Sequence, residues 1–197
     1  MKNNHFEANA FFTYLDNAIV RDDFLLNGND SIVYEGENKK VQALVNGEFA
    51  KIYGVNVGLL IGFNKFIKIR FNHTLTRGED NQERPIRHVS PDFGSVHLIY
   101  HQKKIMADFF IRYNVRFSND QIAPSEQSKT HIYALNSEGN PYVPSFKTIN
   151  FLIQYKLNKS VQITTGIENI LDVGYRPYSS GISAAGRNFK IGVKSHF

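Results

Sequence analysis

The side chains that most often carry out chemistry are present in this sequence, but their spacing forms no familiar active-site motif. There are seven histidines and no cysteine, which excludes thiolate zinc sites, cysteine nucleophiles and disulfides. His97 and His101 share one face of an expected strand, yet four residues span ~13 Å, too far for one metal ion. A serine hydrolase needs Ser, His and an acid in register on neighbouring strands, and no motif indicates one. We therefore expect no catalytic residue, no metal and no cofactor.

Basic side chains are the more informative group. Six basic side chains lie on the polar faces of three expected strands: Lys68, Arg70, Arg112, Arg116, Lys190 and Lys194. Asp108 and Glu168 share those faces, so six basic groups stand against two acidic ones. The net charge of +5 and the pI near 9.3 agree in sign, although such a balance alone is common on solvated surfaces. A face of this kind indicates an anionic ligand.

These residues must be held by β-strands, because apolar and polar residues alternate with period two. From Ile105 to Phe117 the odd positions are all apolar, whereas the even positions are mostly polar. The sequence predicts eight strands, over 6–20, 50–62, 66–77, 93–102, 105–117, 148–155, 161–169 and 189–197. No apolar run approaches the ~18 residues of a membrane-spanning helix, but a membrane strand needs only ~9–11 residues of alternating character.

The connections between these strands alternate in length. Long segments cover 21–40, 78–92, 118–146 and 170–188, and the short ones between them cover 63–65, 103–104 and 156–160. In an antiparallel sheet every second connection lies at the same end, so the long loops gather at one end and the tight turns at the other. Outer-membrane barrels have long extracellular loops and short periplasmic turns. The pattern therefore predicts an all-β fold, the antiparallel wall of a transmembrane β-barrel.

The C-terminal third contains a series of motifs in a fixed order. They are GIENILD at 166–172, YRPY at 175–178, GRNF at 186–189 and a final Phe197. This series resembles the end of a TonB-dependent outer-membrane receptor, in the form found in Bacteroidetes-type bacteria. Ala185 stands where proline is common in that family. The segments AKIYGV at 50–55 and VSPDFG at 89–94 resemble two further strand motifs of the same family.

The resemblance implies that residues 1–197 are the C-terminal portion of a receptor barrel of about 22 strands around a plugged lumen. The plug domain and the signal peptide are absent from this sequence, so TonB would act only through the missing plug. The intact receptor would lie in the bacterial outer membrane and import a scarce nutrient, a ferric siderophore first, with haem or cobalamin as alternatives. The expected partners are outer-membrane lipid, the barrel-assembly machinery and a small-molecule metal chelate, and no nucleic acid.

Two sets of site residues follow. The ligand-binding candidates in the lumen and loops are Lys68, Arg70, Arg112, Arg116, His131 and Tyr133, and for the loop residues a solvated loop without a partner is an equal alternative. By resemblance, the alternating apolar residues Phe189, Ile191, Val193 and Phe197 form the signal that the barrel-assembly machinery reads.

Two other architectures stay open on the sequence. One is a self-closed eight-stranded structural barrel without transport activity, and the other is a soluble ligand-carrying barrel. The interior of an eight-stranded barrel is filled by side chains, where unpaired cations are costly, so the basic inner face favours a wide, wet lumen.

Overall fold

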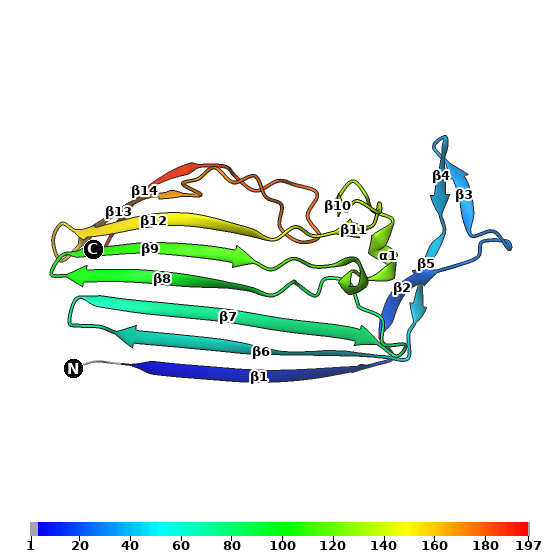
Figure 1. Ribbon diagram of the computed structural model, residues 1–197, viewed down its shortest axis with the longest axis horizontal. Coiled ribbons are helices and arrows are strands. Elements are labelled where there is room, and N and C mark those ends of the chain that lie inside the picture. Colours follow the sequence, from blue (N-terminus) through cyan, green and yellow to red (C-terminus); the bar gives the residue numbers. More distant parts are fainter. Residues whose placement is uncertain (1–3, 197) are drawn as a thin grey trace.

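The computed structural model describes residues 4–196 and consists mainly of one antiparallel sheet of eight strands (Figure 1). Along the sheet these are β1 (His5–Asp16), β6 (Phe49–Gly62), β7 (Ile67–Asp80), β8 (Phe93–Gln102), β9 (Ile105–Asn114), β12 (Phe146–Lys156), β13 (Val161–Glu168) and β14 (Asn188–Ser195). Each strand pairs with the next large strand along the chain. The all-β fold, the eight strands and their up-and-down order are confirmed.

Three strand ends were predicted wrongly. β7 continues to Asp80 rather than ending at 77. β1 ends at Asp16 rather than near Val20, because Asn17 takes a left-handed conformation with φ of 53° and turns the chain into a separate strand. β9 ends at Asn114 rather than Phe117, so Arg116 lies beyond the sheet. None of the helices in the described part of the chain is long and apolar enough to cross a membrane.

The long connections contain small elements that the alternation of the sequence did not indicate. After β1 come β2 (Ile19–Asp23), β3 (Ser31–Tyr34), β4 (Glu37–Lys40) and β5 (Gln42–Asn46), with β2 paired to β5 and β3 to β4. After β9 come a 3-10 turn (Asn119–Gln121), α1 (Pro124–Gln127), β10 (Ala134–Leu135) and β11 (Pro141–Tyr142). The paired ladders project from the end of the sheet that carries the long loops (Figure 1).

The two faces of the sheet differ as the alternation predicts. On the outward face Phe109 lies between Leu98 of β8 and Phe151 of β12, a row of apolar side chains without polar neighbours. Within residues 4–196 nothing covers this face, and Phe6 is 66% and Ile191 83% exposed. An uncovered apolar face of this extent matches contact with lipid tails.

Toward the long loops the outward face becomes polar. Beyond Tyr53, Lys51 Nζ lies 3.1 Å from Glu79, and Arg77 donates both guanidinium nitrogens to Asp92, at 2.5 and 3.1 Å. Charged pairs of this kind belong in the polar headgroup layer or above it, not among lipid tails. The longest strands therefore extend beyond the apolar band.

Gly94 shows how the sheet accommodates its aromatic side chains. A Cβ atom at this position would lie 2.4 Å from the backbone oxygen of Asn72 and 2.4 Å from the hydroxyl of Tyr113. The Tyr113 ring therefore lies across the bare backbone of its neighbour, and its hydroxyl meets His73 Nδ1 at 3.0 Å. Glycine is required here because any side chain would displace the ring.

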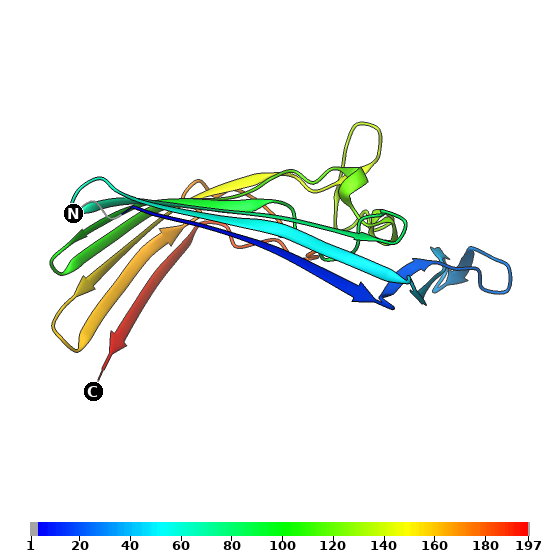
Figure 2. The same cartoon turned by 90° about the horizontal axis from the view of Figure 1, so that it is seen from below.

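The sheet is curved and open (Figure 2). β1 and β14 form its two edges, and over residues 4–196 they share no ladder with each other. The structure therefore contradicts the self-closed eight-stranded barrel, since closure requires exactly that pairing. The tight turns lie at one end of the sheet and the long connections at the other, as expected (Figure 1).

Candidate functional site

The inner face of the sheet contains five of the six predicted cations, and two of these five are paired with Asp108 and Glu168. Lys190 Nζ lies 2.7 Å from Glu168, and Arg70 Nη2 lies 3.9 Å from Asp108. Within the part of the chain that is described, Lys68, Arg112 and Lys194 have no carboxylate within 4.0 Å. The inner face therefore keeps a positive surplus.

The two arginines of β9 and its extension are held by aromatic rings instead of acids. The Arg112 guanidinium lies over the Phe110 ring, 5.1 Å from its centroid. Arg116, past the end of the strand, lies 4.4 Å from the Tyr142 centroid. Cation–π contact orients a guanidinium and leaves its N–H groups free to donate. Arg112 thus belongs to the inner wall, whereas Arg116 belongs to the loops above it.

A polar cluster in the middle of the inner face escaped the sequence reasoning. His97 Nδ1 lies 3.0 Å from both carboxylate oxygens of Asp108, and its Nε2 lies 3.1 Å from Ser95 Oγ. The imidazole stacks on Phe110 at 4.8 Å. The signal was present in the sequence: Ser95 and His97 are two residues apart on one strand face, and the tight turn at 103–104 fixes Asp108 beside them.

The long loops share a small core of their own. It consists of Phe117, Ile122, Tyr133 and Val143, with Ile132 and Tyr178 packed against it. At its centre is Glu126, which is 1% exposed. Glu126 accepts hydrogen bonds from Lys129 Nζ at 2.7 Å and from the Tyr133 hydroxyl at 2.9 Å, and it pairs with Arg87 at 2.5 Å. One carboxylate therefore joins the 81–92 loop to the 115–145 loop.

The third loop, 169–187, is tied to the same core. The Ser179 hydroxyl lies 3.4 Å from Glu126, and Arg176 Nη1 donates to the backbone oxygens of His131 and Ile132, at 2.9 and 3.1 Å. The predicted loop candidates therefore differ. His131 is exposed, whereas Tyr133 is only 6% exposed and packs in the loop core with its hydroxyl bonded to Glu126; ligand binding by either residue stays a prediction.

The electrostatics of this core keep Glu126 charged. Burial raises the pKa of the Glu126 carboxyl, but the hydrogen bonds from Lys129 and Tyr133 and the charges of Lys129 and Arg87 outweigh burial. The net effect is a pKa below the ordinary value. Burial raises the pKa of Tyr133, so its hydroxyl stays protonated and donates.

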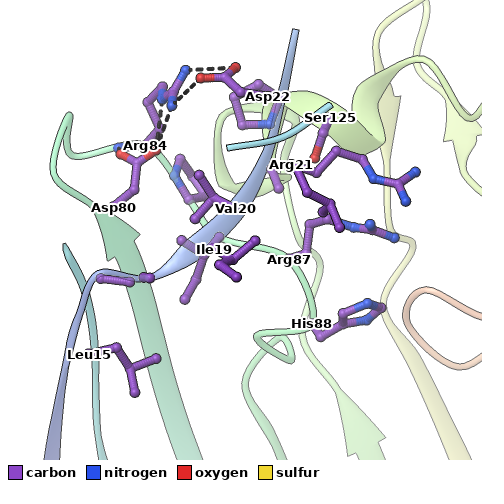
Figure 3. A pocket seen from close by; sticks show the side chains of 17 residues that line it. Leu15, Ile19, Val20, Arg21, Asp22, Asp80, Arg84, Arg87, His88 and Ser125 are labelled. Atoms are coloured by element: carbon purple, nitrogen blue, oxygen red, sulfur yellow. Dashed lines mark hydrogen bonds and ion pairs between the residues drawn. The ribbon is translucent and has the colours of Figure 1, made fainter. Parts of the chain in front are cut away.

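A cavity of about 290 Å³ opens between the base of the β2/β5 ladder and the 81–92 loop (Figure 3). On one side Arg84 bridges Asp22 at 2.9 Å and Asp80 at 2.7 Å. The hydrogen bond from Arg84 lowers the pKa of Asp22 despite partial burial. Opposite this bridge, the side chains of Arg21, Arg87 and His88 extend to the same side of the cavity. The cavity thus combines an apolar floor, including Leu15 and Ile19, with a basic wall.

The structure explains why Asn169, Asp172 and Arg187 stand in the C-terminal motif series: they hold the 169–187 loop. Asn169, buried with φ of 50°, accepts a hydrogen bond from the Val173 amide at 2.9 Å and donates to the Val173 and Ala185 oxygens, at 2.9 and 3.3 Å. Arg187 donates its backbone N–H to Asp172 at 2.7 Å and its Nε–H to the Ile170 oxygen at 2.9 Å. Both ends of the 169–187 loop are thereby clamped together.

We expect Asn169→Ala to loosen this loop. The substitution removes three hydrogen bonds and puts alanine into a left-handed conformation, at a local cost of about 1–3 kcal/mol for the unsatisfied groups and about 1 kcal/mol for the backbone. Hydrogen–deuterium exchange over 170–187 measures the effect. Asn169→Gly is the matched control, because it loses the same bonds without the backbone strain and should loosen the loop less. Unchanged exchange in both variants would contradict the clamp.

The expected assembly signal lies at a sheet edge. Phe189, Ile191 and Val193 alternate along β14 on the outward face and are 72%, 83% and 69% exposed. Phe197, the fourth member of the set, lies outside the described residues. The three described residues extend the apolar band to the edge of the sheet, and their recognition during assembly stays a prediction.

Comparisons with known proteins match the fold. No known family profile matches the sequence, and no curated protein matches it. Among solved structures, the copper transporter OprC superposes with a TM-score of 0.74 at 14% identity, over 98% of this chain and 29% of that one. The siderophore receptor PirA from Acinetobacter baumannii superposes with a TM-score of 0.65 at 18% identity, over 98% of this chain and 30% of that one. The FrpB iron transporter from Neisseria meningitidis superposes with a TM-score of 0.64 at 13% identity, over 96% of this chain and 29% of that one.

The open curved sheet, its apolar outer face and its sorted loops define a class: the wall of an outer-membrane β-barrel. Within that class, the chain has the fold of the TonB-dependent outer-membrane receptors, as the resemblance implied. The chain spans less than a third of the length of the solved structures it matches. The finer resemblance to receptors of Bacteroidetes-type bacteria stays a prediction.

Proposed function

We propose that this chain is a wall segment, the C-terminal portion of the barrel, of a TonB-dependent receptor that imports an anionic metal chelate across the bacterial outer membrane. The observation that carries the proposal is the pairing of two surfaces on one sheet: an outward face with an apolar band and an inner face with surplus positive charge. Lipid on one side and water on the other are the surroundings that suit both.

The ligand class follows from the inner face and from the loops above it. Lys68 and Arg112 are without acidic partners in the described structure, and Arg21 lines one wall of the loop cavity. Cationic groups in a cleft concentrate anions and steer them inward. Solved structures with this fold include receptors named for siderophores and a transporter named for copper, which supports a metal chelate as cargo. A ferric siderophore is our first candidate.

The partners follow from the same fold. Outer-membrane lipid would cover the apolar face, and the barrel-assembly machinery would insert the strands, reading the outward residues of β14. TonB would act through a plug domain, which residues 1–197 do not contain.

Charge reversal tests the proposal. In the receptor that contains this chain, we expect Arg112→Glu combined with Arg116→Glu to reduce uptake of an anionic ferric chelate at least tenfold, because two cations facing the lumen and loops become acids. Uptake of radiolabelled iron measures the change. Lys156→Glu, at the short-turn end, is the matched control, and heat-shifted gel mobility verifies that each variant is folded. Unchanged uptake in the double variant would remove the support for an anionic cargo.

A further inference from the structure

Ser95, His97 and Asp108 have the contacts of a nucleophile, a base and an orienting acid. The hydroxyl lies 3.1 Å from His97 Nε2, and the other ring nitrogen lies 3.0 Å from both Asp108 oxygens. A carboxylate can only accept, so Nδ1 carries the proton and Nε2 is left to accept from Ser95. This is the arrangement in which a serine hydroxyl is activated for attack.

The sheet holds the three residues rigidly. Ser95 and His97 are on one face of β8, and Asp108 lies on β9, two residues from the partner of His97. Phe110 is 2% exposed and stacks on the imidazole, which prevents rotation of the ring. The side chains of His97 and Asp108 are each 15% exposed, so the cluster is sheltered but open to small molecules.

Donors for a developing negative charge flank the hydroxyl. In the register of the sheet, Ser95 pairs with Asn72 on β7 and with Arg112 on β9. Both side chains carry N–H groups, and Arg112 is already oriented by Phe110, 5.1 Å below its guanidinium. Directly paired residues have Cβ atoms about 4.5–5.5 Å apart, so either donor is within reach of an oxyanion on Ser95.

A cavity receives the substrate. It has a volume of about 410 Å³, and its lining includes Ser95, Asn72 and Arg112 together with the aromatic residues Phe93, Phe146 and Tyr175. The nucleophile and the oxyanion donors therefore open into one space, with aromatic rings to bind an apolar group. The basic side chains favour a negatively charged molecule.

We propose that this cluster is a hydrolytic site for small anionic esters, a function beyond import. Ser95 Oγ adds to the ester carbonyl while His97 Nε2 takes its proton, and Arg112 and Asn72 stabilise the oxyanion. The C–O bond breaks, and the leaving alcohol takes the proton from His97. Water then attacks the acyl-serine with His97 as base, which releases the carboxylic acid and restores Ser95. Ester and water become acid and alcohol, and no other reactant is needed. Asp108 is a positioning residue.

A fluorophosphonate probe tests the nucleophile on the purified receptor that contains this chain, in detergent. The probe forms an O–P bond with an activated serine and loses fluoride, and peptide mass spectrometry locates the adduct. We expect the label at Ser95. His97→Ala should slow labelling at least ~100-fold, the typical contribution of a general base, whereas His101→Ala, on the same strand face, should not. Asp108→Asn should slow labelling, and Asp108→Glu should restore part of it, which a merely structural role would not produce.

A second assay defines the substrate class. With 4-nitrophenyl succinate, a negatively charged ester, we expect a burst of nitrophenolate that Ser95→Ala abolishes and Ser90→Ala retains. Arg112→Ala should lower kcat/KM more for this ester than for neutral 4-nitrophenyl acetate. Absence of the label from Ser95 in the folded wild-type receptor, or equal labelling of wild type and His97→Ala, would overturn the proposal. Labelling needs no transport, so its failure is distinct from a failure of the proposed import function.

Discussion

Phe151→Arg is expected to prevent this sheet from accumulating in the outer membrane. Phe151 lies on the outward face of β12, between Phe109 of β9 and Ile167 of β13, in the middle of the apolar band. An arginine at the midplane of a membrane barrel costs about 2–4 kcal/mol, and the lost burial of the ring adds to it. Since a whole protein is stable by only about 5–15 kcal/mol, the loss is a large fraction. Heat-shifted gel mobility of outer-membrane fractions measures the folded amount.

Two control variants are needed. One separates the effect of the added charge from the loss of ring packing, and the other compares the lipid-facing side of the strand with the lumen-facing side. Phe151→Ala removes the ring without adding charge and should lower the folded amount less than Phe151→Arg. Gln154→Arg places the same cation on the same strand but on the inner face, and it should be close to neutral. If Gln154→Arg were as damaging as Phe151→Arg, the assignment of the two faces would be wrong.

Glu126→Gln is expected to release all three loops of the loop core. The substitution leaves Arg87 and Lys129 without their shared counter-charge in a buried position, and breaking such a pair typically costs about 3–5 kcal/mol. Because the sheet does not depend on this contact, the loss should be local. Hydrogen–deuterium exchange should rise over 81–92, 115–145 and 169–187 and stay unchanged in β6 and β7. The matched control is Glu138→Gln, an exposed acid of the same loop, which should leave exchange unaltered.

The same carboxylate gives the loop core a pH dependence. The pKa of Glu126 is lower in the folded protein than its ordinary value, so the unfolded state binds more protons in acid. The stabilisation is therefore complete above the ordinary carboxyl pKa of about 4.3 and is lost as the pH falls through the lower folded value. Exchange over the three loops should rise below about pH 4 in the wild type and be less sensitive to pH in Glu126→Gln. A loop core equally protected at all these pH values would contradict the assignment.

The sheet could be predicted because its signal is local. Period-two alternation fixes which residues share a face, and short turns such as 103–104 fix the register of the strands that they join. The errors occur where the pattern continues past a backbone turn: Ala18 and Val20 continue the even-numbered apolar positions of β1, yet the left-handed Asn17 starts a new strand.

The loop core could not be predicted, since its contacts join positions far apart without any periodicity. Glu126, Arg87 and Ser179 come from three different loops, and no spacing in the sequence relates them. Tyr133 was named as a ligand-binding candidate of a long loop, but this loop has its own apolar core, and Tyr133 is buried in it. For Ser95 and Asp108 the register was predictable, whereas the direction of the His97 ring was not.

Because the strands have unequal lengths, the two sides of the wall differ in stiffness at the rim that carries the long loops. β6 and β7 have 14 residues each, and β13 and β14 have 8, a difference of about 20 Å along the strand direction. On the side of the long strands the rim consists of continuous backbone ladder, which moves only if many hydrogen bonds break together. On the side of the short strands, the part of the wall at the level of the upper ends of β6 and β7 is the 169–187 loop. This loop is held by single contacts such as those of Asn169 and Arg187. Thermal motion of the rim will therefore be concentrated beside β13 and β14, while the opposite rim keeps its shape.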